Sequence, residues 1–135
     1  MKHRISKFKI KSGDDANQML LKKLVRNFVK NGSLKTTMTK ARYLKSTVES
    51  LAHSALNYTE SVKNILLPFF SSVHEVNDFV ESVKARSLNG TGSGIVKIVK
   101  LGTREGDAVE VGKVIWSKDL EPAKKTKVKK TDNAK

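Results

Sequence analysis

The chain has 135 residues, the size of one domain, and the 38% of them that are apolar can form a modest core. A formal net charge of +14 indicates a polyanionic partner. Nucleic acid is the first choice for this partner and an acidic membrane surface is the second. The lack of cysteine excludes disulfides, thiolate metal sites and cysteine nucleophiles, and the longest apolar run, residues 65–70, is too short to span a bilayer.

The positive charge is concentrated at the two ends of the chain. Residues 1–45 carry a net charge of +11 and residues 122–135 carry +5, whereas the part between them carries −2. We expect a basic arm at residues 1–12, a single α/β domain at residues 13–120 and a disordered basic tail at residues 121–135. The arm is either a solvated terminus or, as we favour, a segment that orders on RNA through residues such as Lys7 and Lys9. The tail is either a solvated extension or a second polyelectrolyte arm.

A helical periodicity runs from residue 16 to residue 30 and divides this segment into two sides. The apolar side chains group on one side, with Val29 as the exception: Leu20, Leu21, Leu24, Val25 and Phe28. The basic side chains share an arc of roughly 100° on the other side: Lys22, Lys23, Arg26 and Lys30. Asp14 or Asp15 is expected to cap the helix and Gly32 to end it. The pattern predicts one side buried in the domain and one side facing phosphate.

A short strand at residues 34–36 and a second helix follow, with Thr37 as the expected N-cap. Apolar residues at spacings of three and four predict the core face of this helix: Ala41, Leu44, Val48, Leu51, Ala52 and Ala55. Its first turns carry Lys40, Arg42 and Lys45, which the helix dipole disfavours. A phosphate beside the start of the helix would offset that cost.

Two further helices are expected around residues 58–67 and 73–85, in a mildly acidic region that we interpret as scaffold. Asn57 with Glu60, and Ser72 with Glu75, have the spacing of reciprocal helix caps. Pro68 is expected to end or kink the earlier helix. The buried face of the later helix is predicted to consist of Val73, Val76, Phe79, Val80 and Val83.

Two runs rich in β-branched residues, 95–101 and 109–116, are joined by a turn-forming segment and predict a hairpin. Gly112 is expected to mark a bulge or a close backbone contact. The glycine-rich residues 90–94 follow a helix and precede a strand, so we interpret them as a flexible turn and not a phosphate-binding loop. The hairpin and the strand at 34–36 would form a small sheet packed against about four helices. This is the α+β class, as a two-layer α/β domain.

No catalytic constellation is present in the sequence. His3, His53 and His74 lie far apart and none has ligand spacing with another histidine or a carboxylate. We therefore expect no enzyme, no cofactor, no metal and no small-molecule substrate. No apolar signal segment follows the N-terminus, so an intracellular, cytoplasmic protein is expected. The few aromatic residues are not interleaved with the basic ones, which favours a folded RNA surface over a single strand as the partner.

Three stretches of the chain together resemble bacterial large-subunit ribosomal protein seventeen. They are residues 1–6, residues 34–37 with 40–45 and Glu49, and the hairpin residues 94–98 with 101–108, in the order and spacing of that family. The chain departs from the family at Lys7, where a small glycine is usual, and at residues 14–17, where the family has a Ser/His/Arg cluster. Lys22 and Lys23 replace the family's Arg-Asn pair, which keeps charge and loses bidentate geometry.

The resemblance implies a structural constituent of the ribosome with no catalytic residues. Such a protein is bound to large-subunit (23S) ribosomal RNA near the peptide exit tunnel, with ribosomal proteins twenty-two and thirty-two as expected neighbours and no membrane contact. The positions implied to face RNA are His3, Arg4, Thr36, Thr37, Lys40, Lys45, Lys97 and Arg104. The alternative is a non-ribosomal basic protein that coats or compacts DNA.

Overall fold

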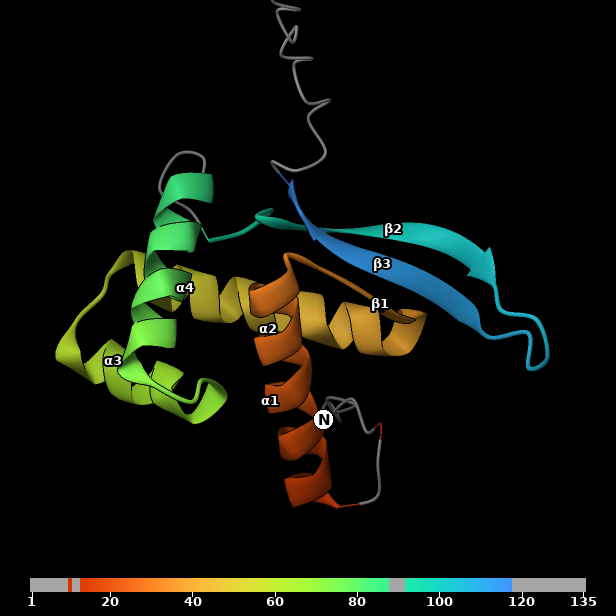
Figure 1. Ribbon diagram of the computed structural model, residues 1–135, viewed down its shortest axis with the longest axis horizontal. Helices are drawn as coiled ribbons and strands as arrows, with labels where there is room; N and C mark the ends of the chain where they lie inside the picture. The colour runs from red at the N-terminus through yellow and green to blue at the C-terminus, as the bar shows by residue number, and fades with distance from the viewer. Residues whose placement is uncertain (1–9, 11–12, 88–91, 118–135) are drawn as a thin grey trace, which may run out of the picture.

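A computed structural model of the protein describes residues 10, 13–87 and 92–117. The elements, in chain order, are α1 (Asp14–Asn31), β1 (Ser33–Thr37), α2 (Met38–Leu56), α3 (Glu60–Leu66), the 3-10 turn η1 (Leu67–Phe69), α4 (Val73–Arg86), β2 (Val96–Thr103) and β3 (Glu110–Trp116). Figure 1 shows the three strands together on one side of the molecule, with α3 and α4 at the opposite end. The expected arm and tail, residues 1–12 and 121–135, lie outside the described residues apart from Ile10.

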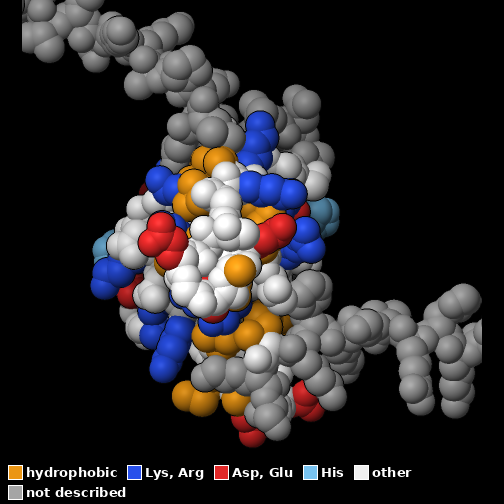
Figure 2. Space-filling view, turned by 90° about the vertical axis from the view of Figure 1, so that its right-hand side faces the viewer, with side chains coloured by type: hydrophobic (Ala, Val, Ile, Leu, Met, Phe, Trp, Pro, Cys, Tyr) orange, Lys and Arg blue, Asp and Glu red, His pale blue; other side chains and the backbone are white. Residues whose placement is uncertain are grey.

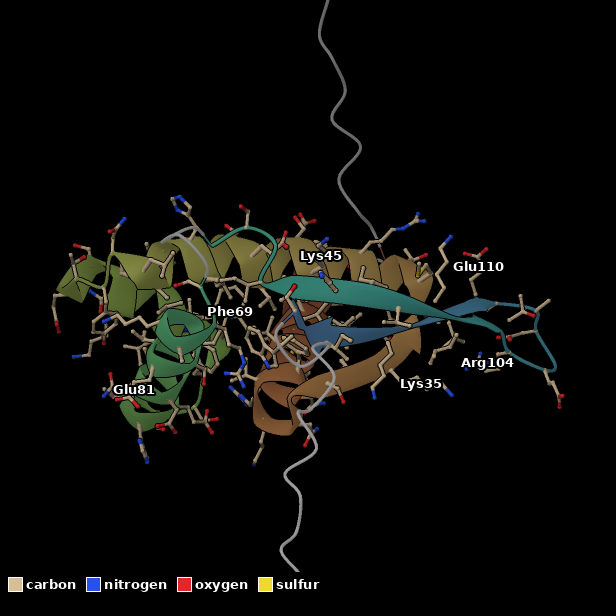
Figure 3. All side chains as sticks on the ribbon, turned by 90° about the horizontal axis from the view of Figure 1, so that it is seen from above. Lys35, Lys45, Phe69, Glu81, Arg104 and Glu110 are labelled. Atoms are coloured by element: carbon tan, nitrogen blue, oxygen red, sulfur yellow. The ribbon has the colours of Figure 1, made fainter. Side chains whose placement is uncertain are left out.

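The sheet is antiparallel and has the strand order β1-β3-β2. The short strand near the N-terminus therefore pairs with the far strand of the hairpin, and Leu34 lies opposite Val114. Helix α2 packs against all three strands and covers one face of the sheet. No helix of residues 13–87 packs on the other face (Figure 3). The prediction of a two-layer α+β domain, with about four helices on a small sheet, is confirmed.

Helix α1 ends as predicted but starts differently. Gly32 follows it in the left-handed conformation, with φ of 72°, and its N–H donates to the Phe28 carbonyl over 2.8 Å. The prediction that an aspartate caps the start is wrong, because Gly13 occupies the N-cap position and both aspartates lie within the first turn. There the carboxylates complement the helix dipole instead. Asn17 ties down this end, donating from Nδ2 to the Gly13 carbonyl and accepting from the Ile10 N–H.

The core lies between α1, α2, α4 and the inner face of the sheet. All six predicted core residues of α2 are buried, and Thr37 is its N-cap, as expected. Phe28 of α1 packs on Trp116 of β3, with ring centroids 4.7 Å apart, and Phe70 packs on Phe79 of α4 at 5.1 Å. These aromatic pairs join the hairpin and α4 to the rest of the domain.

The expected details of α3 and α4 are partly wrong. Thr59, and not Asn57, is the N-cap of α3, because Asn57 still terminates α2. The expectation at Ser72 is confirmed, since its hydroxyl accepts from the Glu75 N–H over 3.3 Å, although the Glu75 carboxylate accepts from the Ser71 N–H. Val73 is 43% exposed and not part of the buried face, because it is the first residue of α4 and lies at the edge of the core.

The α3 helix ends at Leu66, and the segment containing Pro68 forms the 3-10 turn, as its proline predicted. In the hairpin, the regular pairing shifts between Lys100 and Gly102, so that Leu101 is the extra residue of a bulge in β2. Gly112 of β3 lies opposite this point. A Cβ there would come within 2.9 Å of the Met38 sulfur, which confirms the expected close contact.

Candidate nucleic-acid interface

A cleft of about 410 Å³ lies where the end of β1, the first turn of α2 and the start of the hairpin loop meet. It is lined by Lys35, Thr36, Thr37, Lys40, Leu101, Gly102, Thr103, Arg104 and Val111. The two lining segments are more than sixty residues apart in the chain and are joined by the pairing of β1 with β3. The lining includes three cationic side chains and no acidic one. Figure 3 shows Lys35 and Arg104 at the same end of the sheet.

Four positions predicted to face RNA lie together in this cleft: Thr36, Thr37, Lys40 and Arg104. The first turn of α2 has no acidic residue, and the Thr37 side chain makes no capping hydrogen bond. The first N–H groups of the helix thus lack a side-chain acceptor, and such groups bind anions well when cations stand beside them. The Lys40 ammonium is such a cation, and it forms no ion pair within the described part of the chain.

Arg104 is held by an acid of its own loop. Its Nε donates to Oδ1 of Asp107 over 3.1 Å and a second guanidinium nitrogen donates to Oδ2. This hydrogen bonding lowers the pKa of Asp107 and raises that of Arg104. The loop is closed further by the Arg104 N–H, which donates to the Val109 carbonyl. Asp107 therefore orients the exposed Arg104 side chain and compensates part of its charge before any ligand arrives.

The four cations of α1 do not form one uniform surface. Lys23 and Lys30 are exposed, whereas Lys22 and Arg26 are half-buried. Arg26 and Lys30 line a groove of about 300 Å³ together with Glu75 and Asp78 of α4. No ion pair crosses this groove among the described residues, and Nε of Arg26 is buried without a hydrogen-bond partner. Lys23 is therefore accessible away from this groove, whereas Arg26 and Lys30 share the groove with two carboxylates of α4.

The remaining predicted positions are separate from the cleft. Lys45 lies 4.0 Å from Glu49, whose carboxylate also accepts from the Gly94 N–H, so its charge is partly engaged. Lys97 is exposed on β2. The predicted arm positions lie outside the described residues: His3, Arg4, Lys7 and Lys9.

Two basic residues were missed from the sequence, Lys35 and Lys113. Both are exposed, and they lie directly opposite each other in the pairing of β1 with β3. The signal that could have found them is strand alternation, because each lysine stands next to an inward-facing residue, Leu34 and Val114 respectively. Figure 2 looks onto the hairpin end, where Lys and Arg side chains lie on both sides of the molecule.

Within residues 10, 13–87 and 92–117, no helix is long and apolar enough to cross a membrane. Among the same residues, no group of three His, Asp or Glu side chains is placed to hold a metal ion. Of the clefts described above, the one beside β1 has the greater excess of basic over acidic side chains. Its chemistry is suited to an anion.

Comparison with known proteins gives a consistent result. The family model "Ribosomal protein L17" matches residues 20–114. The large ribosomal subunit protein bL17 of Neorickettsia sennetsu is 32% identical over 109 residues, which cover 80% of this chain and 92% of the relative. The bL17 proteins of Campylobacter hominis and Thermotoga maritima are 31% and 26% identical, covering 82% and 84% of this chain and 93% and 92% of their own lengths. The resemblance noted in the sequence is confirmed, and the chain belongs to the ribosomal protein L17 family.

Proposed function

We propose that this protein binds large-subunit ribosomal RNA through the cleft at the hairpin end, with the outer side of α1 as an additional contact. As a member of its family it is a structural constituent of the large ribosomal subunit and not an enzyme. The observation that carries the binding mode is the composition of the cleft. Lys35, Lys40 and Arg104 converge there from three elements beside an uncapped helix start, with no acidic lining residue.

The cleft is suited to positioning a phosphate backbone. The side chains of Thr36 and Thr37 line the cleft together with the cations, and threonine hydroxyls can donate to phosphate or ribose oxygens. Contacts of this kind recognise the shape and the 2′-hydroxyls of folded RNA, with little dependence on base sequence. Arg104 adds a guanidinium that Asp107 already orients, so little side-chain freedom is lost on binding.

Further RNA contacts and the position on the ribosome are proposed from the resemblance to the family. We propose that residues 1–12 and 121–135 act as basic extensions of the domain at residues 13–120. His3, Arg4, Lys7 and Lys9 on the first extension, and Lys22, Lys23, Arg26, Lys30, Lys45 and Lys97 on the domain, are proposed as further RNA contacts. The site proposed on the ribosome is the surface near the peptide exit tunnel, beside ribosomal proteins twenty-two and thirty-two. Crosslinking of the purified large subunit, followed by identification of the crosslinked proteins, tests those neighbours.

The test of the mechanism is the salt dependence of binding to a transcript of bacterial 23S ribosomal RNA. If about eight phosphates are neutralised, log K should fall against log salt concentration with a slope of roughly −6 to −7. An affinity that does not respond to salt would contradict the phosphate mechanism. Equal affinity for the transcript and for an unrelated DNA duplex would instead favour the DNA-coating alternative.

The Lys40→Gln variant tests the cleft itself. Losing one phosphate contact should reduce the slope by about 0.7–0.9, which corresponds to roughly fivefold weaker binding at 0.15 M salt. Lys63→Gln is the matched control, since Lys63 pairs with Glu60 on α3 over 2.9 Å and lies outside the cleft. Equal effects of the two substitutions would show that only net charge matters and would refute the cleft as the binding site.

A further inference from the structure

Among the helices that the structure describes, none covers the second face of the sheet. Helix α2 packs on the side to which Leu34, Val96 and Val114 point. The intervening residues of each strand point the other way, and Figure 3 shows the three strands side by side with α2 beyond them. We call this outward side the open face.

The open face carries three lysines in adjacent registers. In one row across the sheet, Lys35 of β1 lies opposite Lys113 of β3, and Lys113 lies opposite Val99 of β2. In the next outward-facing row, Lys97 of β2 lies opposite Ile115 of β3. All three lysines are exposed. Within the described strands no outward position is acidic, because Glu110 of β3 has the inward parity and lines a small pocket with Met38 of α2.

This arrangement is unfavourable for the free protein. Like charges directly opposite each other on neighbouring strands destabilise a sheet, and Lys35 and Lys113 are such a pair. Neither lysine forms an ion pair with a carboxylate of the described residues. Exposed Val99 and half-buried Ile115 add apolar surface between the lysines. A face with exposed cations, no acidic side chain in its strands and small apolar surfaces is complementary to a sugar-phosphate backbone. The charge of such a backbone would relieve the repulsion between the lysines, and its riboses would cover the apolar side chains.

The open face is also continuous with the cleft. Lys35 belongs to both, because it lines the cleft and stands in the same row as Lys113. A strand of RNA held in the cleft at Lys40 and Lys35 would therefore pass next over Lys113 and Lys97. We infer that the open face of the sheet is a second RNA-binding surface that extends the cleft, with Lys113 and Lys97 as its phosphate contacts. This inference rests on the proposed function.

The experiment compares two double variants of the full chain for binding to the 23S transcript. Lys97→Gln/Lys113→Gln removes two cations of the open face, and neither residue lines the cleft. Lys84→Gln/Lys100→Gln removes the same charge from exposed lysines that point elsewhere, Lys84 on α4 and Lys100 on the inward side of β2. The cleft variant Lys40→Gln serves as the reference.

The open-face variant should reduce the salt slope by about 1.4–1.8, which is roughly 15- to 30-fold weaker binding at 0.15 M salt. The control should lose less than about threefold. The midpoint of thermal unfolding of the open-face variant should be no lower than that of the unsubstituted protein, because the repulsion between Lys113 and Lys35 is gone. Weaker binding without lower stability is the result that a merely structural role would not produce.

Two outcomes would overturn the inference while leaving the cleft as the proposed RNA-binding site. In the first, the open-face variant binds as the control does while Lys40→Gln still weakens binding. In the second, the open-face variant keeps full RNA affinity but is no longer incorporated into large subunits, which would assign the face to a protein neighbour. Failure of the proposed function would give a distinct result, because the unsubstituted protein itself would then show no salt-dependent binding to the transcript.

Discussion

Replacing Phe28 with alanine tests the division of α1 into a buried and a basic side. The Phe28 side chain is fully buried, and its ring packs on Trp116 at 4.7 Å. Truncation of a buried phenylalanine costs about 3–5 kcal/mol through lost apolar contacts and the cavity left behind. Against a total stability on the order of 5–15 kcal/mol, this is a large fraction. For a domain of about a hundred residues, the midpoint of thermal unfolding should fall by roughly 12–20 °C.

Urea unfolding followed by tryptophan fluorescence measures the effect directly, because Trp116 is the single tryptophan and lies against the substituted ring. The midpoint should fall while the slope with denaturant stays constant. Lys23→Gln, on the exposed side of the same helix, is the control and should change stability by less than about 0.5 kcal/mol. A loss below about 1 kcal/mol for Phe28→Ala, or equal losses for both variants, would refute the assignment of the two sides.

Three more predictions concern the loops. Gly92→Ala places a Cβ against the backbone of His53, too close for van der Waals contact, so thermal unfolding should show a loss of about 1–3 kcal/mol, and Ser93→Ala should show almost none. Gly32→Ala forces a left-handed conformation on alanine and should cost about 1–2 kcal/mol in urea unfolding, whereas Gly32→Asn should cost less. Acidification should release Arg104 from Asp107. In the folded protein the pKa of the Asp107 carboxyl lies below its usual value near 3.8. The ion pair therefore stabilises the fold at pH values above 3.8, and this contribution is lost as the pH falls through the folded pKa. Carbon-13 titration of the carboxyl measures it, and an Arg104→Gln variant with an unchanged Asp107 pKa would contradict the stated cause.

The behaviour of α1 shows why a helical projection identified the basic side only in part. The projection placed Val29 among the lysines, yet in the structure it is half-buried and packs against the core. The reason is that α1 is covered from more than one direction, by α2 and β1 and also by the turn η1. Arg26 is half-buried and lies across a groove from Glu75 and Asp78.

At Gly112 in the hairpin, too, the sequence predicted the local structure only in part. A glycine in a strand predicted a bulge or a close contact at Gly112, and the close contact with Met38 is there. The bulge lies instead on the opposite strand, at Leu101. The glycine therefore lies opposite the bulge, and the sequence of the two strands alone does not indicate which of them carries the extra residue.

The sequence by itself determined the type and order of the elements, the buried face of α2, the left-handed end of α1 at Gly32 and the family to which the chain belongs. These follow from local periodicity, glycine chemistry and motif spacing, which act within a few residues of each other. Only the tertiary structure decided that β1 pairs with β3. That pairing joins Lys35 to Arg104 in one cleft and sets Lys35 opposite Lys113 on the open face. The physical reason is that a strand's pattern shows which side is apolar, whereas its partner is selected by how all the apolar faces of the domain are buried together.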